Sequence, residues 1–148
     1  MKFFYIIIIS VWLIAGCSSE LNYDLGYAAV IGDVEKMREL IAGGAEVNSK
    51  VGKDEVTPLE YAINGGSLNA VQLLLDNGAD PNFSSSSDIS PLFHAFSNGN
   101  CEIASLLMNN GAKLKLPSRL DGFNDDIRRH QYDKNFLTLL KKAGYIPP

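Results

Sequence analysis

One short phrase recurs along the chain at a nearly constant interval. It stands as LIAGGAEVN at residues 40–48, as LLDNGADPN at 74–82 and as LMNNGAKLK at 107–115, and a weaker copy, LKKAGYIPP, occupies 140–148. The glycine in fifth place marks the register, at Gly44, Gly78, Gly111 and Gly144, which are 34, 33 and 33 residues apart. A fixed period of this length is typical of stacked supersecondary units.

In each unit, the residues that precede this glycine predict two consecutive helices. Thr57 and Ser90 each precede a proline, which suits a hydroxyl N-cap followed by Pro at the first helical turn. Glu60 stands three residues after Thr57 and completes a predicted capping box. Leucine and alanine at i and i+3 predict one buried stripe on each first helix, and a leucine repeats on each second helix: Leu25 and Ala28, Leu59 and Ala62, Leu92 and Ala95, then Leu40, Leu74 and Leu107.

This unit resembles the ankyrin repeat, in which a β-turn is followed by two antiparallel helices. The resemblance implies an all-α solenoid of about three repeats in residues 24–116, with short β-hairpin loops whose tips are KVGKDE (50–55) and SSSSD (84–88). Residues 117–148 are expected to form a degenerate C-terminal capping repeat that keeps the second-helix pattern at Phe136, Leu137, Leu139 and Leu140. The chain departs from the family where ankyrin repeats usually have a histidine two residues after the proline, because Glu60 and Phe93 stand there.

The first residues, MKFFYIIIISVWLIAGC, have the pattern of an export signal. One lysine is followed by an apolar run over 3–15, which is shorter than the roughly 20 residues that cross a bilayer. The end of the run, Ile14-Ala15-Gly16-Cys17, resembles the lipobox of bacterial lipoproteins. The resemblance implies that residues 1–16 are removed and that Cys17 is lipidated. A plain secretory signal with a coincidental cysteine, or a membrane anchor, remains an alternative.

Residues 17–23 are then expected to be a short lipidated tether that holds the folded part close to the membrane. Ser18, in place of an aspartate after the cysteine, favours the outer membrane. The expected location is therefore the bacterial cell envelope, lipid-anchored and facing the periplasm.

Charge is distributed unevenly along the chain. Residues 18–112 contain 13 Asp/Glu and 4 Lys/Arg, whereas residues 113–148 contain 4 and 8. An acidic body on an exported chain argues against nucleic acid as a partner. The basic end, which includes Lys141 and Lys142, either forms a solvated face or contacts lipid or protein.

Candidates for chemistry are few, so the sequence predicts neither an enzyme nor a cofactor, metal or small-molecule substrate. His94 falls beside the alanine stripe, where a partly exposed surface position is expected, with a catalytic or metal role as the alternative. Cys101 aligns with apolar positions and is expected to be a buried small side chain. The acidic segment DGFNDD (121–126) suits a helix start better than a calcium loop.

The remaining expectation is a surface that binds another protein. In ankyrin proteins the partner usually meets the hairpin tips and the exposed ends of the first helices. By alignment, the candidate binding residues are Tyr27, Val30, Ile31, Lys53, Asp54, Tyr61, Asn64, Phe83, His94, Ser97 and Asn98. Tyr27, Tyr61 and His94 either form a ladder of anchors or fill gaps between helices. The apolar pair Val30 and Ile31, at positions that are usually exposed, predicts an exposed apolar patch that binds a partner.

Two functions fit a lipid-anchored binding module of this kind. Ankyrin-type lipoproteins in bacteria can serve as immunity proteins against a lipase or another envelope toxin, which the resemblance offers as the leading possibility. The alternative is a periplasmic scaffold that supports an envelope or stress-protection enzyme.

Overall fold

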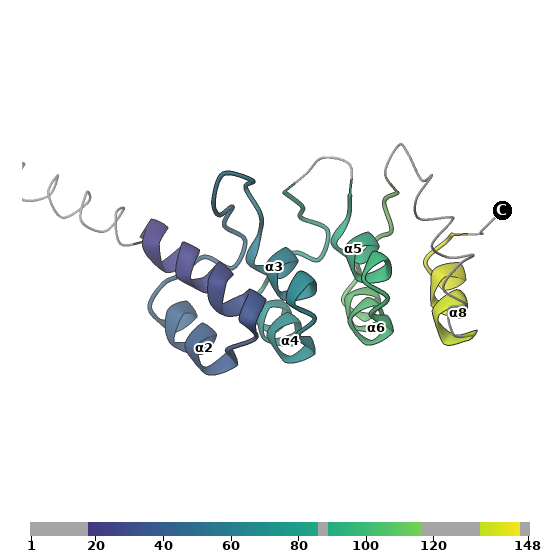
Figure 1. The fold of residues 1–148 in the computed structure, drawn as a ribbon, viewed down its shortest axis with the longest axis horizontal. Helices are drawn as coiled ribbons and strands as arrows, with labels where there is room; N and C mark the ends of the chain where they lie inside the picture. The colour runs from purple at the N-terminus through teal and green to yellow at the C-terminus, as the bar shows by residue number, and fades with distance from the viewer. Residues whose placement is uncertain (1–17, 86–88, 117–133, 146–148) are drawn as a thin grey trace, which may run out of the picture.

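The computed structural model describes residues 18–85, 89–116 and 134–145. Helices stand side by side along a single axis, and the loops that join successive units lie on one side of them (Figure 1). Residues 18–31 form the first helix. The others are α2 (Val34–Ala42), α3 (Pro58–Gly65), α4 (Leu68–Asp76), α5 (Pro91–Ser97), α6 (Cys101–Asn109) and α8 (Lys134–Lys142).

The helices pair within a unit and stack between units. α3 packs on α4 and α5 on α6 within their units, while α3 contacts α5, and α2, α4, α6 and α8 contact one another in turn. First helices therefore form one layer and second helices the other. The expected all-α solenoid of about three repeats is confirmed.

Local sequence explains where the helices begin and end. The Thr57 hydroxyl accepts a hydrogen bond from the Glu60 backbone N–H, and Glu60 bonds back to Thr57, so the predicted capping box is present. The Ser90 hydroxyl accepts from the Phe93 backbone N–H and caps α5, without the return bond. The glycines that mark the period all have left-handed backbones, with φ between 83° and 99°, and they follow the ends of α2, α4, α6 and α8: Gly44, Gly78, Gly111 and Gly144.

The predicted stripes form the core. The leucines and alanines of the first helices are at most 2% exposed, and the leucines of the second helices at most 5%. In α8, Phe136 and Leu140 are buried, and the Phe136 ring meets the edge of Phe96 with centroids 5.5 Å apart. The terminal helix packs on α6 at the end of the stack, with Lys134, Lys141 and Lys142 exposed. A capping repeat over 117–148 stays a prediction, because residues 117–133 and 146–148 lie outside the described residues.

The first helix reaches into the segment expected to be a short lipidated tether, because residues 18–23 are helical and continue without a break into 24–31. One expectation about burial is wrong. Cys101 is half-buried rather than buried, because it is the first residue of α6 and lies at the rim of the layer. The hairpin loops are less regular than expected: among the described residues they contain one isolated β-bridge, between Val51 and Val56.

Several sequence predictions lie outside the described residues. They concern Cys17 and the export signal, the acidic segment 121–126 and the part of the basic end in 117–133. Within the part of the chain that is described, no helix is long and apolar enough to cross a membrane.

Gly65 provides a test of how closely the first helix and α3 approach. A Cβ added at Gly65 would lie 2.0 Å from the carbonyl oxygen of Val30, which is too close for any side chain. We expect Gly65→Ala to lower the free energy of unfolding by about 1–3 kcal/mol, because the two helices must move apart. Urea unfolding followed by circular dichroism measures the change.

Gly43→Ala is the matched control. Gly43 has φ of −77°, which alanine adopts readily, and we expect a change within about 0.5 kcal/mol. Equal stability of the Gly65→Ala protein and the wild type would show that the two helices are not in tight contact.

Candidate protein-binding site

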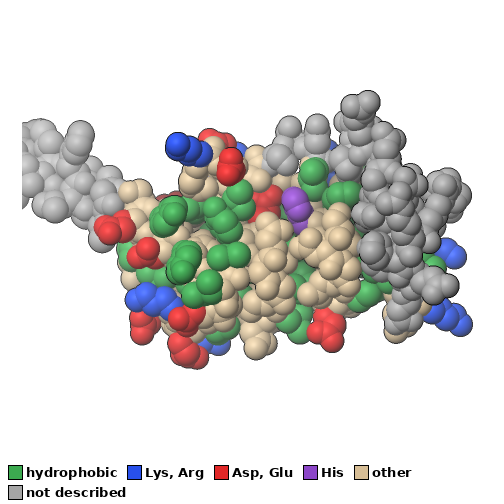
Figure 2. All heavy atoms as spheres, in the orientation of Figure 1, with side chains coloured by type: hydrophobic (Ala, Val, Ile, Leu, Met, Phe, Trp, Pro, Cys, Tyr) green, Lys and Arg blue, Asp and Glu red, His purple; other side chains and the backbone are tan. Residues whose placement is uncertain are grey.

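Apolar side chains gather on the surface of the first repeat. Tyr23, Tyr27 and Ile31 follow one another at intervals of four residues on the first helix, so they share one face, and they are 60%, 64% and 59% exposed. Figure 2 shows a cluster of hydrophobic side chains on this part of the molecule. We call this surface the N-terminal apolar patch and define it by six residues: Tyr23, Tyr27, Val30, Ile31, Val51 and Tyr61.

A small pocket lies within the patch. Its volume is about 90 Å³, and it is lined by five of the six patch residues, all except Ile31. The Tyr61 ring can lie close to the first helix because residue 26 is glycine: a Cβ at Gly26 would be 3.0 Å from Cδ2 of that ring. Val51 is 4% exposed and is held by its bridge to Val56. The first helix, α3 and the first hairpin loop therefore build the pocket together.

The pocket brings together only some of the predicted binding residues. Tyr27, Val30 and Tyr61 line it, and Ile31 is exposed on the first helix. Asn64 is exposed at the end of α3, and Ser97 and Asn98 are exposed at the end of α5. Asn98 also donates from Nδ2 to the carbonyl of Ile63, at 3.4 Å.

The proposed aromatic ladder is therefore only partly assembled. Tyr27 and Tyr61 line the same pocket, whereas His94 is half-buried on α5 and is not among the residues that line it. Tyr23 is not among the predicted binding residues, because the sequence predicts a lipidated tether over 17–23. Its spacing of four residues from Tyr27 was the signal that could have found it.

The two loops supply the remaining candidates. Lys53 and Asp54 are exposed at the tip of the first loop. Phe83, at the start of the second loop, is 36% exposed, and the Lys50 Nζ lies 5.8 Å from the centroid of its ring. This cation–π contact links the first loop to the second.

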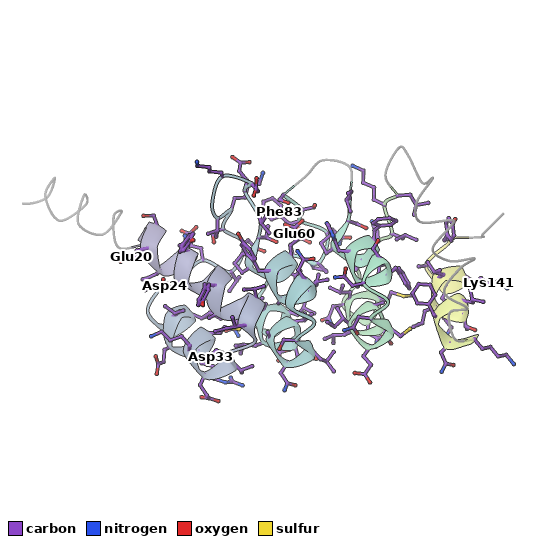
Figure 3. The ribbon with its side chains drawn as sticks, viewed as in Figure 1. Glu20, Asp24, Asp33, Glu60, Phe83 and Lys141 are labelled. Carbon is purple, nitrogen blue, oxygen red and sulfur yellow. The ribbon has the colours of Figure 1, made fainter. Side chains whose placement is uncertain are left out.

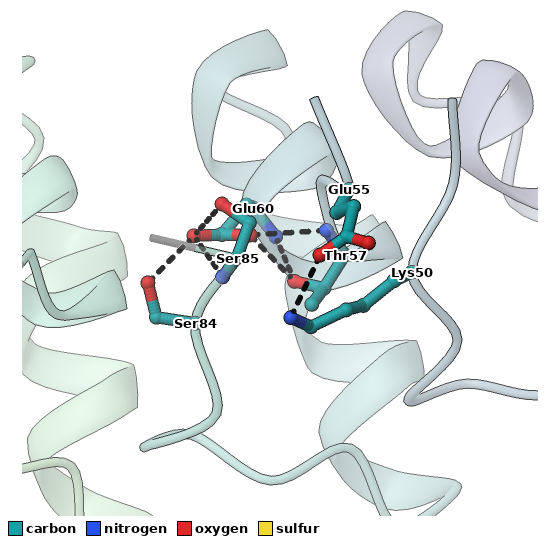
Figure 4. A network of polar contacts seen from close by, with 6 residues as sticks. All are labelled: Lys50, Glu55, Thr57, Glu60, Ser84 and Ser85. Carbon is teal, nitrogen blue, oxygen red and sulfur yellow. Dashed lines mark hydrogen bonds and ion pairs between the residues drawn. The ribbon is translucent and has the colours of Figure 1, made fainter. Parts of the chain in front are cut away.

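Buried Glu60 fixes the second loop to α3 (Figure 4). Its carboxylate accepts hydrogen bonds from the Thr57 backbone N–H at 3.0 Å and the Thr57 hydroxyl at 3.1 Å. It also accepts from the Ser84 hydroxyl at 3.0 Å and from the backbone N–H and hydroxyl of Ser85 at 3.2 and 3.0 Å. Glu60 is 2% exposed, so its carboxyl oxygens are satisfied by these donors rather than by water.

Acidic side chains lie near the N-terminal apolar patch. Glu20 and Asp24 lie on the first helix itself, and Asp33 follows its end (Figure 3). In the described stretch 18–85 there are eleven Asp/Glu and four Lys/Arg, and Lys50 is paired with Glu55 at 3.2 Å. The patch thus combines exposed aromatic rings with an acidic border. Among the described residues, no group of three or more His, Cys, Asp or Glu is placed to hold a metal ion.

Glu60→Gln tests how strongly the second loop is held. The amide NH₂ would face N–H and O–H donors that now bond to the carboxylate, so we expect a loss of about 1–3 kcal/mol in the free energy of unfolding. Glu39→Gln is the control, because the Glu39 side chain is 71% exposed, and its effect should stay within about 0.5 kcal/mol. Urea unfolding of both variants measures the difference. If Glu60→Gln were as stable as the control, the network would not secure the loop.

Comparison with known proteins agrees with this architecture. The palmitoyltransferase AKR1 of Kluyveromyces lactis is 39% identical over 62 residues, which are 42% of this chain. The match spans only 8% of the length of that protein, so it bears on the repeats and not on its activity. The family described as ankyrin repeats (3 copies) matches residues 25–118, well over half of the chain. The chain therefore belongs to the ankyrin-repeat family.

Proposed function

We propose that the protein binds another protein through its N-terminal apolar patch. Ankyrin repeats are protein–protein interaction modules, and the observation that supports this particular surface is the row of exposed Tyr23, Tyr27 and Ile31 on one helix face. Isolated apolar residues are common on surfaces, but a contiguous group on a rigid element is typical of an interface. The patch also contains tyrosine, which is enriched among residues that dominate binding energy.

The proposal includes a lipid anchor at Cys17 in the bacterial cell envelope. The lipobox-like sequence that ends at Cys17 supports it. Residues 18–31 are helical, and a helix rises about 1.5 Å per residue, so Tyr23 would lie within about 10 Å of the anchor point. Two acyl chains would be needed for stable attachment. Anchoring would then raise the effective concentration of the binding site at the membrane surface.

Two roles are proposed for such an anchored module. An immunity protein would neutralise a lipase-type toxin where the toxin acts, and the acidic body would speed association with a basic toxin. A periplasmic scaffold would instead hold an envelope or stress-protection enzyme. The neighbouring gene separates them, because a toxin gene favours immunity and an enzyme gene favours the scaffold.

Substitution of exposed patch residues tests the binding surface. The full chain carries a C-terminal tag and is solubilised in detergent, and we compare wild type with a Tyr27→Ser, Ile31→Asp double variant. We expect the variant to lose the captured protein by at least tenfold, because a buried aspartate without a partner opposes binding. Quantitative mass spectrometry of the captured proteins is the measurement.

Leu68→Asp is the matched control for that experiment. Leu68 is 36% exposed at the start of α4, outside the patch, and an aspartate in the first turn suits a helix. It should capture the same protein as wild type, and circular dichroism should show all three folded. Equal capture by the double variant would place the interface elsewhere on the stack.

Cys17→Ser tests the anchor. We expect the wild type to incorporate radiolabelled palmitate and to sediment with membranes, and the variant to lose the label because serine offers no thiol for acylation. Labelling that persists in the variant would contradict lipidation at this residue. An unlabelled wild type that is released in soluble form would instead support the plain secretory signal.

A further inference from the structure

Three tyrosines from two helices converge on the small pocket of the patch. Tyr23 and Tyr27 come from the first helix and Tyr61 from α3, and the volume between them is about 90 Å³. Pockets for drug-sized molecules are about 300–1,000 Å³, so this one has room for the end of one side chain. Its occupant is therefore a single group rather than a separate small molecule.

The lining favours a cation that has an apolar stem. The face of an aromatic ring carries partial negative charge and attracts ammonium or guanidinium groups within about 6 Å. Val30 and Val51 provide apolar surface beside the rings, against which a methylene chain can pack. A carboxylate would find no cationic side chain among the residues that line the pocket.

The charges near the pocket also favour a cation. Glu20 and Asp24 lie on the helix that supplies two of the tyrosines (Figure 3). Of the four cationic side chains in the described stretch 18–85, none lines the pocket, and Lys36 and Lys50 are each paired with a glutamate oxygen at 3.2 Å. An approaching cation is therefore attracted, and an anionic lipid surface is repelled.

Resting on the proposed function, we infer that this pocket receives an arginine or lysine side chain of the partner protein. Arginine fits it better, because its planar guanidinium stacks on aromatic faces and is more weakly hydrated than an ammonium group. The partner is thus a protein with a basic side chain projecting from an apolar surface, which docks against Ile31 and the exposed tyrosine rings. Specificity comes from the cation in the pocket, and most of the buried apolar area comes from the surrounding patch.

A pair of probes that differ only in charge tests this assignment. N-acetyl-arginine amide and N-acetyl-citrulline amide have the same shape, but citrulline is neutral. The full chain, labelled with 3-fluorotyrosine in detergent, is titrated with each and followed by fluorine NMR, with resonances assigned by single Tyr→Phe variants. We expect the signals of Tyr23, Tyr27 and Tyr61 to move with arginine amide, which should bind about fivefold more tightly than citrulline amide. Equal affinity for the two probes would overturn the inference.

Two double variants show whether the preference for arginine depends on the aromatic rings or only on apolar surface. Tyr23→Leu with Tyr27→Leu keeps apolar surface but removes two rings, whereas Tyr23→Phe with Tyr27→Phe keeps the rings and removes the hydroxyls. We expect the leucine variant to lose the preference for arginine and the phenylalanine variant to retain most of it. Loss in both variants would assign the preference to the hydroxyl groups and contradict a cation–π site.

The same variants show whether this inference or the proposed function has failed. If the leucine variant captures the partner as well as wild type while the Tyr27→Ser, Ile31→Asp variant does not, the patch binds the partner without a cation in the pocket. If the leucine variant and the Tyr27→Ser, Ile31→Asp variant both lose the partner, and the phenylalanine variant keeps it, both proposals are supported. Capture by every variant would remove the patch from the interface altogether.

Discussion

The fold depends on contact between one repeat and the next, because a single pair of short helices cannot bury its own apolar face. Apolar stacking provides most of the stability, but it does not fix the spacing of the loops. One asparagine in each of the first two repeats does so. Asn48 donates to the Gly78 carbonyl at 3.0 Å and accepts from the Asp80 N–H at 2.8 Å, and Asn82 repeats the pattern with Gly111 and Lys113 at 3.2 and 2.8 Å. Each asparagine thus satisfies two backbone groups of the following repeat.

Glu60 shows how a departure from the family pattern changes the attachment of a loop. Its carboxylate only accepts hydrogen bonds, so it can gather donors from α3 and from the next loop at once. Phe93, at the equivalent position of the next unit, is 7% exposed and joins the apolar core. In that unit the Ser90 hydroxyl accepts a hydrogen bond from the Lys115 backbone N–H at 3.0 Å and donates one to the Lys115 carbonyl at 3.3 Å. In one unit, therefore, the second loop is held by a carboxylate, and in the next unit the backbone at Lys115 is held by a hydroxyl group.

Most of the fold could be predicted from the period, the caps and the leucine stripes, because each of these depends on neighbouring residues in one helix. The capping box at Thr57 and the left-handed glycines are examples. The candidate site was predicted less well, since it depends on contacts between elements. Nothing local to Gly26 reveals that its missing side chain leaves room for the Tyr61 ring. Nothing near Val51 reveals that it lines the same pocket as Tyr23. Tyr23 itself was lost because the helix begins earlier than the repeat alignment suggests.

The two ends of the stack differ in a way that helix packing alone does not require. Both end units lack a neighbour on one side, and a polar outer face would serve solubility at either. α8 meets that need with Lys134, Lys141 and Lys142. The first helix instead exposes Tyr23, Tyr27 and Ile31 beside Glu20 and Asp24. Leaving three large apolar side chains in water forgoes the stabilisation that burial would give them, about 25 cal/mol for each Å² of apolar area. A surface that meets a partner recovers this free energy on binding, and the acidic border keeps the same surface soluble until then.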